Sequence, residues 1–256
     1  MTERNEKAAR LRELHRPGEP LILPNVWDAG SAGVVEELGY PAIATASAAI
    51  AAMLGYPDHE GAPADEMFAA AGRVIRAVTV PVTVDAEAGY GLPPAELVER
   101  LADIGAAGCN LEDTDHRTGS LVEVSAQADR IAAVRAAADA AGVDLVINAR
   151  ADTFIGKAPD PVPAAIERGR RYLEAGADCV YPIMVALADD IAALVEGIPG
   201  PINANQLPGM DLARLAELGV ARVSYGPMPY LMGLDTLKGM AGRLLDGGDP
   251  YDTSGK

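Results

Sequence analysis

The chain has 256 residues, of which 49% are hydrophobic and only 4% aromatic, and its formal net charge is −16. Such an acidic balance argues against nucleic acid and against an anionic membrane surface as partners, because both attract basic patches. Two cysteines, Cys109 and Cys179, are too few for a disulfide framework. Neither a signal peptide nor an apolar run of transmembrane length is recognised, so we expect a cytoplasmic protein.

A helix is predicted within residues 1–20, and from residue 21 onward strands alternate with helices. The predicted strands cover 21–27, 41–46, 80–86, 108–112, 145–149, 178–183, 201–205 and 222–225. The predicted helices cover 31–38, 64–78, 94–104, 125–141, 163–175, 188–195, 212–218 and 230–245, and several end at a glycine that can cap them. A long loop of small residues, through 55–61, is expected after the second strand, and a frayed tail at 246–256.

Eight strands in strict alternation with helices predict an α/β fold with a parallel sheet closed into a (β/α)₈ TIM barrel, with residues 1–256 as a single domain. A barrel of this kind typically needs about 250 residues. The doubly wound alternative would require a glycine-rich phosphate-binding turn after the first strand, and residues 28–33 (Asp-Ala-Gly-Ser-Ala-Gly) lack that pattern.

Polar residues two positions apart stand at the carboxyl ends of four predicted strands. They are Asp85 with Glu87, Asn110 with Glu112, Asn148 with Arg150, and Asn203 with Asn205. Alternate residues of a strand share a face, and barrel chemistry sits at the carboxyl ends of strands, so these pairs are expected to converge. Carboxylates suit a hard cation such as Mg²⁺, and an arginine can hold a carboxylate in bidentate fashion. The alternative for Arg150 is a structural ion pair with Glu112 or Glu87.

The three histidines are weaker candidates. His59 and the preceding Asp58 lie in the loop after the second strand, where either could support a metal site or simply form a turn. His116, in the loop after the fourth strand, could titrate near neutral pH or be exposed to solvent. His15 is expected on the surface of the first helix.

Five motifs resemble the isocitrate lyase/phosphoenolpyruvate mutase superfamily. They are Leu23–Asp28, Leu54–Asp58, Val84–Gly91, Asn110–Asp113 and Ile147–Asp152. The resemblance implies a (β/α)₈ barrel that binds Mg²⁺, with Mn²⁺ as a possible substitute, together with a 2-oxo acid. It also implies a homo-oligomer, a dimer or a tetramer.

The resemblance further implies a role for individual residues. The metal ligands would be Asp85, Glu87 and Glu112, with Asp85 binding directly and the two glutamates, together with Asp58, holding the metal's water molecules. The catalytic residues would be Asp58, Arg150 and His116. The substrate would contact Trp27, Ala46, Ser47, Ala48, Asp85, Arg150 and Asn203, with Arg150 holding its carboxylate.

Residues 115–120, Asp-His-Arg-Thr-Gly-Ser, stand where lyases of this superfamily carry a lid with a Lys-Lys-Cys-Gly-His-type stretch. The loop here is short and has no cysteine, which indicates a phosphoenolpyruvate mutase-like subgroup. We predict a Mg²⁺-dependent lyase that makes or breaks a C–C bond at C3 of a small 2-oxo acid, such as oxaloacetate, through a metal-stabilised enolate. The alternatives are phosphoenolpyruvate phosphonomutase or phosphonopyruvate hydrolase chemistry, and a 2-oxo-acid-binding protein that has lost catalysis.

Overall fold

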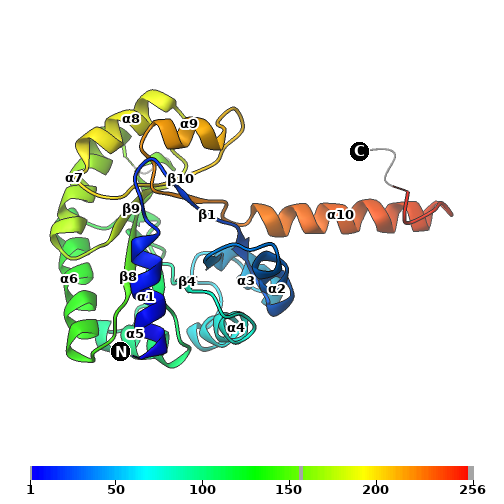
Figure 1. Cartoon of the computed structure of the whole chain (residues 1–256), viewed down its shortest axis with the longest axis horizontal. Coiled ribbons are helices and arrows are strands. Elements are labelled where there is room, and N and C mark those ends of the chain that lie inside the picture. The colour runs from blue at the N-terminus through cyan, green and yellow to red at the C-terminus, as the bar shows by residue number, and fades with distance from the viewer. Residues whose placement is uncertain (1, 156–157, 253–256) are drawn as a thin grey trace.

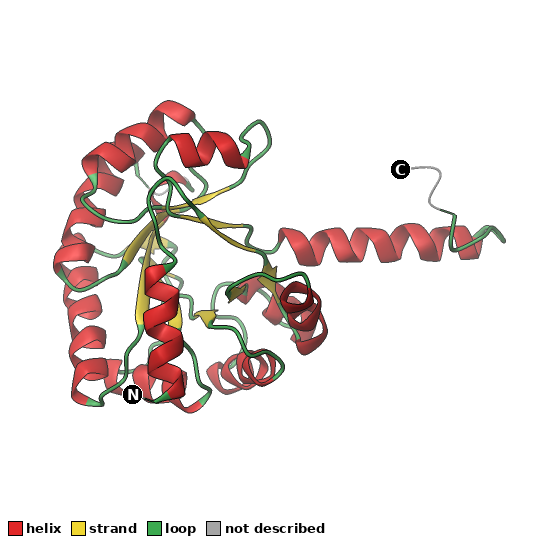
Figure 2. Cartoon of the chain, in the orientation of Figure 1, coloured by secondary structure: helices red, strands yellow, loops and turns green. Residues whose placement is uncertain are grey.

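Short parallel strands, each followed by a helix, form the centre of the structure, and the helices surround them (Figures 1 and 2). The computed structural model describes residues 2–155 and 158–252, so the last four residues of the predicted tail lie outside it. The barrel strands are β1 (Leu21–Leu23), β2 (Asn25–Val26), β3 (Ile43–Thr45), β4 (Val82–Asp85), β5 (Gly108–Glu112), β8 (Val146–Ala151), β9 (Cys179–Pro182), β10 (Asn203–Asn205) and β11 (Arg222–Ser224).

The helices are α1 (Glu3–Glu13), α2 (Ala29–Glu37), α3 (Ser47–Leu54), α4 (Ala64–Arg76), α5 (Pro94–Asp103), α6 (Val124–Ala140), α7 (Pro161–Glu174), α8 (Ala188–Gly197), α9 (Leu212–Glu217) and α10 (Met228–Leu245), with a 3₁₀ turn η1 at Asp152–Phe154. Glycines follow many of them, as predicted. Gly105 after α5 and Gly176 after α7 have φ of 85° and 101°, which other residues rarely adopt, and each turns the chain into the next strand.

The strands close into a barrel in chain order. Parallel pairing runs through β2-β3-β4-β5-β8-β9 in one sheet and through β1-β11-β10 in another. Pro24, which lacks an N–H group for the ladder, separates β1 from β2, and a bridge between Val180 and Ile202 joins the two sheets on the other side. With β1 and β2 counted as one stave, eight staves surround the axis, and the predicted fold is confirmed.

The two faces of each barrel strand have different partners. Outward-facing residues of β5 and β8, such as Leu111 and Ile147, are fully buried against apolar residues of α5 and α6, such as Leu101 and Ile131. This layer is the main hydrophobic core, and full burial of each such side chain contributes about 1.5–3 kcal/mol. It holds the carboxyl ends of β4, β5 and β8 in a fixed register.

The middle of the barrel interior is polar, above an apolar layer in which Leu23 and Val146 pack with Leu11 of α1. Asn110, Asn148, Asn203 and Arg222 are at most 6% exposed. Asn148 Nδ2 donates to Asn110 Oδ1 at 2.8 Å, and the Arg222 guanidinium donates to the same oxygen at 3.2 Å. These side chains form a hydrogen-bonded floor beneath the carboxyl ends of the strands.

Three local features differ from the sequence-based expectation. Residues 47–54 form α3 instead of a loop, since Ala, Leu and Met are good helix formers even where they show no polar face. The polar loop after β5 contains a small antiparallel hairpin of β6 (Thr114–Asp115) and β7 (Ser120–Leu121). The surface position predicted for His15 is wrong: the residue is 7% exposed, and its Nδ1 lies 2.8 Å from the Leu11 carbonyl oxygen.

Helix α10 extends away from the barrel (Figure 1). None of its 18 residues is buried, and its exposed apolar residues include Leu231, Met232 and Leu237, which are 47–66% exposed. Its first turn still contacts the barrel, since Tyr230 packs edge-on against Trp27 with ring centroids 5.3 Å apart. Over the described part of the chain, no helix is both long and apolar enough to span a bilayer.

Candidate metal and substrate site

A cavity of about 150 Å³ lies at the carboxyl ends of the barrel strands. This is smaller than the ~300–1,000 Å³ of sites for drug-sized ligands, so it suits a molecule of a few heavy atoms. The cavity is lined by Asn25, Ala46, Ser47, Ala48, Asp58, His59, Asp85, Glu87, Asn110, Glu112, Arg150, Tyr181, Ile183, Ser224, Gly226 and Pro227. It therefore contains the predicted carboxylates, the predicted arginine and the predicted 46–48 segment.

Asp85, the last residue of β4, is fixed on one side only. Its Oδ2 accepts hydrogen bonds from the backbone N–H of Ser47 at 3.0 Å and from the Ser47 hydroxyl at 2.8 Å. Ser47 begins α3, so the Asp85 carboxylate also lies at the positive end of that helix. The other oxygen, Oδ1, is buried and makes no hydrogen bond within the described structure. An acceptor left open in this way is available to a ligand.

Glu87 follows β4 in the left-handed region, with φ of 49°, a conformation uncommon for a residue with a side chain. The side chain is only 2% exposed. Its two oxygens accept hydrogen bonds from the Tyr90 hydroxyl at 2.7 Å and from the Glu60 backbone N–H at 2.6 Å. Burial first, and then the negative charges of Asp85 and Glu112, raise the pKa of Glu87 to about 7, although these two hydrogen bonds act to lower it.

Glu112 and Arg150 form the next layer. They are direct partners in the β5–β8 register, so their side chains meet across the two strands in an ion pair. Arg150 Nε also donates to Asp152 Oδ1 at 2.6 Å, and NH2 donates to Oδ2 at 3.1 Å. Burial raises the pKa of Glu112, while Arg150 and His116 oppose the shift. The ion pair with Glu112, which the sequence left as an alternative role for Arg150, is thus present, and it lies within the cavity beside the other carboxylates.

Asp152 is held in turn by a buried network behind the strands. It accepts a hydrogen bond from the Thr114 hydroxyl, and its backbone N–H donates to Asp113 at 2.9 Å. Asp113, at 0% exposure, also accepts from Arg168 at 2.9 Å and from the Tyr172 hydroxyl at 2.7 Å. The orientation of the guanidinium is therefore fixed from outside the cavity.

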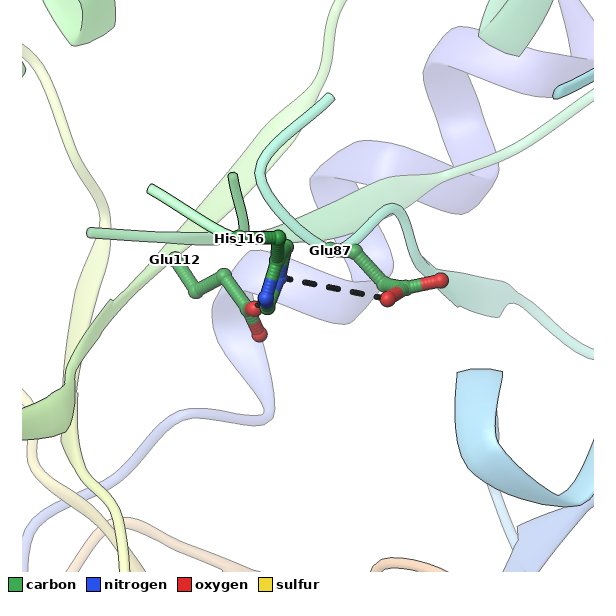
Figure 3. Close-up of side chains that lie close together, drawn as sticks. All are labelled: Glu87, Glu112 and His116. Atoms are coloured by element: carbon green, nitrogen blue, oxygen red, sulfur yellow. Dashed lines mark ion pairs between the residues drawn. The ribbon is translucent and has the colours of Figure 1, made fainter. Parts of the chain in front are cut away.

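His116 lies behind Glu112 rather than in the cavity lining. Its side chain is 8% exposed, pairs with Glu112 and lies 4.0 Å from Glu87 Oε2 (Figure 3). The hydrogen bond to Glu112 raises the pKa of His116, and partial burial opposes the shift. The ring of His59 lies against that of His116, with centroids 5.2 Å apart. His116 is thus enclosed, not exposed to solvent.

The charges of the cavity are unbalanced. Its lining has four carboxylates, on Asp58, Asp85, Glu87 and Glu112, against one guanidinium, Arg150. One potential ligand atom from each of Glu87, Glu112 and His116 lies within 4.8 Å of the others. Buried carboxylates are costly without a cation, and carboxylate oxygens are suitable ligands for Mg²⁺ or Mn²⁺. Together with the open oxygen of Asp85, this donor set fits a divalent cation.

Two predicted substrate residues lie outside the cavity. Asn203 is fully buried within the floor, where its Nδ2 donates to the Ser224 hydroxyl at 3.1 Å. Trp27 packs against Tyr230 at the start of α10 and against the cluster that covers α3 and α4. Neither side chain therefore reaches the cavity in this conformation.

Comparison with known proteins places the chain in a family. The family model described as phosphoenolpyruvate phosphomutase matches residues 11–245. The chain belongs to the isocitrate lyase/phosphoenolpyruvate mutase superfamily. An uncharacterized Mycobacterium tuberculosis relative is 34% identical over 92% of this chain and 88% of its own length. The 2,3-dimethylmalate lyase of Eubacterium barkeri is 32% identical over 82% of this chain and 75% of its own.

Solved structures of the superfamily share the fold. A putative phosphonomutase from Burkholderia cenocepacia matches with a TM-score of 0.88 and 45% identity over 93% of this chain and 99% of its own. An oxaloacetate acetylhydrolase in complex with the product oxalate matches with a TM-score of 0.85 and 25% identity over 98% and 91% of the two chains. Since the characterised relatives are lyases, mutases and a hydrolase of small acids, the chain is placed among enzymes.

Several residues of the site were not singled out from the sequence. Tyr181 lines the cavity as the register partner of Arg150 on β9, and its hydroxyl accepts from Asn205 at 2.7 Å. Asn25 Oδ1 accepts from the backbone N–H groups of Tyr225 and Gly226 at 2.8 and 3.0 Å. The inward spacing of Tyr181 along its strand is a signal that could have found it. The bonds of Asn25 join distant loops, so they leave no local pattern.

Proposed function

We propose that this superfamily member is a Mg²⁺-dependent lyase that makes or breaks the bond to C3 of a small 2-oxo acid, such as oxaloacetate or another 3-substituted pyruvate. The observation that carries the proposal is Arg150, which faces a cavity of about 150 Å³ beside three converging carboxylates. An anionic substrate needs the guanidinium, and the carboxylates need a cation. A metal-chelating 2-oxo acid satisfies both requirements.

The cation would be held by Asp85, through its open oxygen, with Glu87, Glu112 and Asp58 close enough to bind it or its water molecules. When bound, a divalent cation stabilises negative charge that develops on the 2-oxo oxygen as the C3 bond breaks. Ser47 orients the Asp85 carboxylate through two hydrogen bonds. Burial of the two glutamates keeps bulk water away from these charges.

Arg150 has donors to spare for the substrate. A guanidinium has five N–H groups, and the contacts with Asp152 and Glu112 use three, which leaves two. Two donors are what a bidentate bond to a carboxylate requires. Because Asp152 holds the guanidinium plane, the substrate carboxylate would be oriented as well as bound.

Carbon–carbon chemistry is favoured over carbon–phosphorus chemistry by the charge of the lining. A phosphonate or phosphate dianion would need additional cations, whereas Arg150 and His59 are the basic residues of the lining. The names of the dimethylmalate lyase and the oxaloacetate acetylhydrolase support C–C cleavage. The putative phosphonomutase, at 45% identity, supports carbon–phosphorus chemistry instead, so the experiment below includes substrates for it.

The test is a panel of oxaloacetate, 2,3-dimethylmalate, 2-methylisocitrate, phosphoenolpyruvate and phosphonopyruvate, each with and without Mg²⁺, with detection of 2-oxo acid products and phosphate. We expect metal-dependent C–C cleavage of one member. Asp85→Asn, which keeps the shape of the side chain, should lower kcat by at least ~10². The control is Asp139→Asn, an exposed residue of α6.

Three outcomes would contradict the proposal. Phosphate release from phosphonopyruvate without C–C cleavage would establish the phosphorus chemistry. Tight Mg²⁺-dependent binding of oxalate, an enolate analogue, with no turnover of any panel member would indicate a binding protein. Full activity of Asp85→Asn would show that the metal site is misplaced.

A further inference from the structure

The buried donors at Glu87 and Glu112 include a nitrogen. His116 brings its Nε2 to the carboxylate of Glu112 and to 4.0 Å from Glu87 Oε2 (Figure 3). Both glutamates are 2% exposed and the imidazole is 8% exposed, so little water can reach the space between them. Solvated acidic residues on a surface do not show this enclosure.

The spacing suits ligands of one ion. Around an octahedral ion with bonds of ~2.1 Å, adjacent ligands lie ~3 Å apart and opposite ligands ~4.2 Å apart. The 4.0 Å between His116 Nε2 and Glu87 Oε2 is close to the separation of opposite ligands, and the three candidate atoms lie within 4.8 Å of one another. His116 Nε2 and the Glu112 oxygen with which it pairs lie closer together than adjacent ligands, so this contact has to open slightly when the ion binds. A second observation points to a ligand: Asp85 Oδ1, in the same cavity as the two glutamates, is buried and has no hydrogen-bond partner.

The β6–β7 hairpin, which follows β5, positions the imidazole. His116 follows β6 in the hairpin after β5, and the neighbouring Asp115 holds the turn by accepting from the Arg117 backbone N–H at 2.9 Å and the Thr118 hydroxyl at 3.0 Å. The His59 ring lies against the other side of the imidazole. Glu87 and Glu112 line the substrate cavity and His116 does not, so the imidazole meets these carboxylates from outside that cavity.

We propose that His116 is a nitrogen ligand of the divalent cation, so that the site prefers Mn²⁺ or another first-row transition ion to Mg²⁺. Imidazole suits such ions, whereas Mg²⁺ selects oxygen ligands, and affinity along the series rises from Mn²⁺ towards Cu²⁺. The inference rests on the proposed function in that both require a cation at these carboxylates. It differs from the oxygen-only set expected from the sequence.

The experiment uses the metal alone and the full-length protein. Mn²⁺ is added to metal-stripped protein, and pulsed electron paramagnetic resonance measures hyperfine coupling to ¹⁴N, which appears only when a nitrogen lies on the ion. The expected result is a ¹⁴N signal in the wild type and in Arg117→Ala, an exposed neighbour in the same turn, and its loss in His116→Ala. His59→Phe, which keeps a ring against His116 but removes its nitrogens, should retain the signal.

Calorimetric titration provides the second readout. We expect Mn²⁺ to bind the wild type at least ~10-fold more tightly than Mg²⁺, and His116→Ala to lose ~10–100-fold in Mn²⁺ affinity with a smaller loss for Mg²⁺. Mn²⁺ binding without a ¹⁴N signal would overturn the role of His116 and leave the proposed function standing. A signal that disappears in His59→Phe but persists in His116→Ala would assign the ligand to His59 instead. Failure of both ions to bind would remove the metal-dependent function as well.

Discussion

Substitution of Glu87 by Gln should make the metal-free protein more stable at pH 8, although it removes part of the metal site. Glu87 is 2% exposed, and burial first, then the charges of Asp85 and Glu112, raise its pKa from 4.5 to about 7. A carboxyl group with a raised pKa binds its proton more tightly in the folded state than in the unfolded state. The folded state is therefore favoured below pH 4.5, and this contribution is lost as the pH rises through about 7.

The size of the effect follows from the shift. At about 1.4 kcal/mol per unit, ionisation of Glu87 costs the metal-free fold about 3 kcal/mol above pH 7. A glutamine has no such cost. Its amide can accept from the Glu60 N–H and donate to the Tyr90 hydroxyl, so both present hydrogen bonds have a neutral replacement. Glu87→Gln should exceed the wild type by less than about 1 kcal/mol at pH 5 and by about 2–3 kcal/mol at pH 8.

The assay is urea unfolding in EDTA at pH 5, 6, 7 and 8, with Glu99→Gln, an exposed residue of α5, as the control. Saturating metal reverses the order, because a ligand at 100 times its Kd stabilises the wild type by about 2.7 kcal/mol and the variant has lost a carboxylate from the site. If Glu87→Gln is less stable than the wild type by the same amount at every pH, the raised pKa of Glu87 is wrong. The free-energy cost of ionising Glu87 beside Asp85 and Glu112 would then be wrong as well.

Three further predictions concern other parts of the molecule. Arg150→Lys keeps the charge but loses the fork that Asp152 orients, so kcat/KM for the best panel substrate should fall by ~10²–10³ with little change in circular dichroism; an unchanged kcat/KM would exclude the clamp. Burial lowers the pKa of His15 to about 4, so its neutral form stabilises the fold above pH 6.5. About 3 kcal/mol of this stability is lost as the pH falls through about 4. His15→Gln should make the free energy of unfolding in urea less dependent on pH over that range, and an unchanged pH dependence would contradict the lowered pKa. Light scattering should find the wild type as a dimer or tetramer, and Leu234→Glu with Leu237→Glu, on the exposed face of α10, should lower its mass; a monomeric wild type would exclude the oligomer.

The barrel and most of its elements were predictable because they depend on local periodicity. Apolar strands and glycine-ended helices repeat along the chain, and a parallel register then brings Glu112 and Arg150 together without further information. Helix α3 was missed because its small apolar residues show no polar face. Whether such an apolar segment becomes a helix or a loop depends on the elements that pack against it, and local sequence does not reveal these elements.

The parts of the site that the sequence did not predict depend on the paths of loops. His116 reaches Glu112 because a hairpin turns back over the strand end, and His59 meets it through a backbone with φ of 66°. Asn203 has the spacing of a cavity residue but lies one layer too deep, against Ser224. Strand alternation gives the direction of a side chain but not its height along the barrel axis, and the height decides whether it touches a ligand.

Helix α10 draws no tertiary packing energy from its own barrel beyond its first turn, since none of its residues is buried. An isolated helix of 18 residues is marginal in water, because nucleation is costly and only packing offsets it. Should the predicted oligomer form through α10, the order of this segment depends on dilution: at nanomolar concentration a protease should trim the chain back to the region of Pro227, whereas a concentrated sample should resist cleavage. Two laboratories that work at different concentrations would then handle molecules of different effective length.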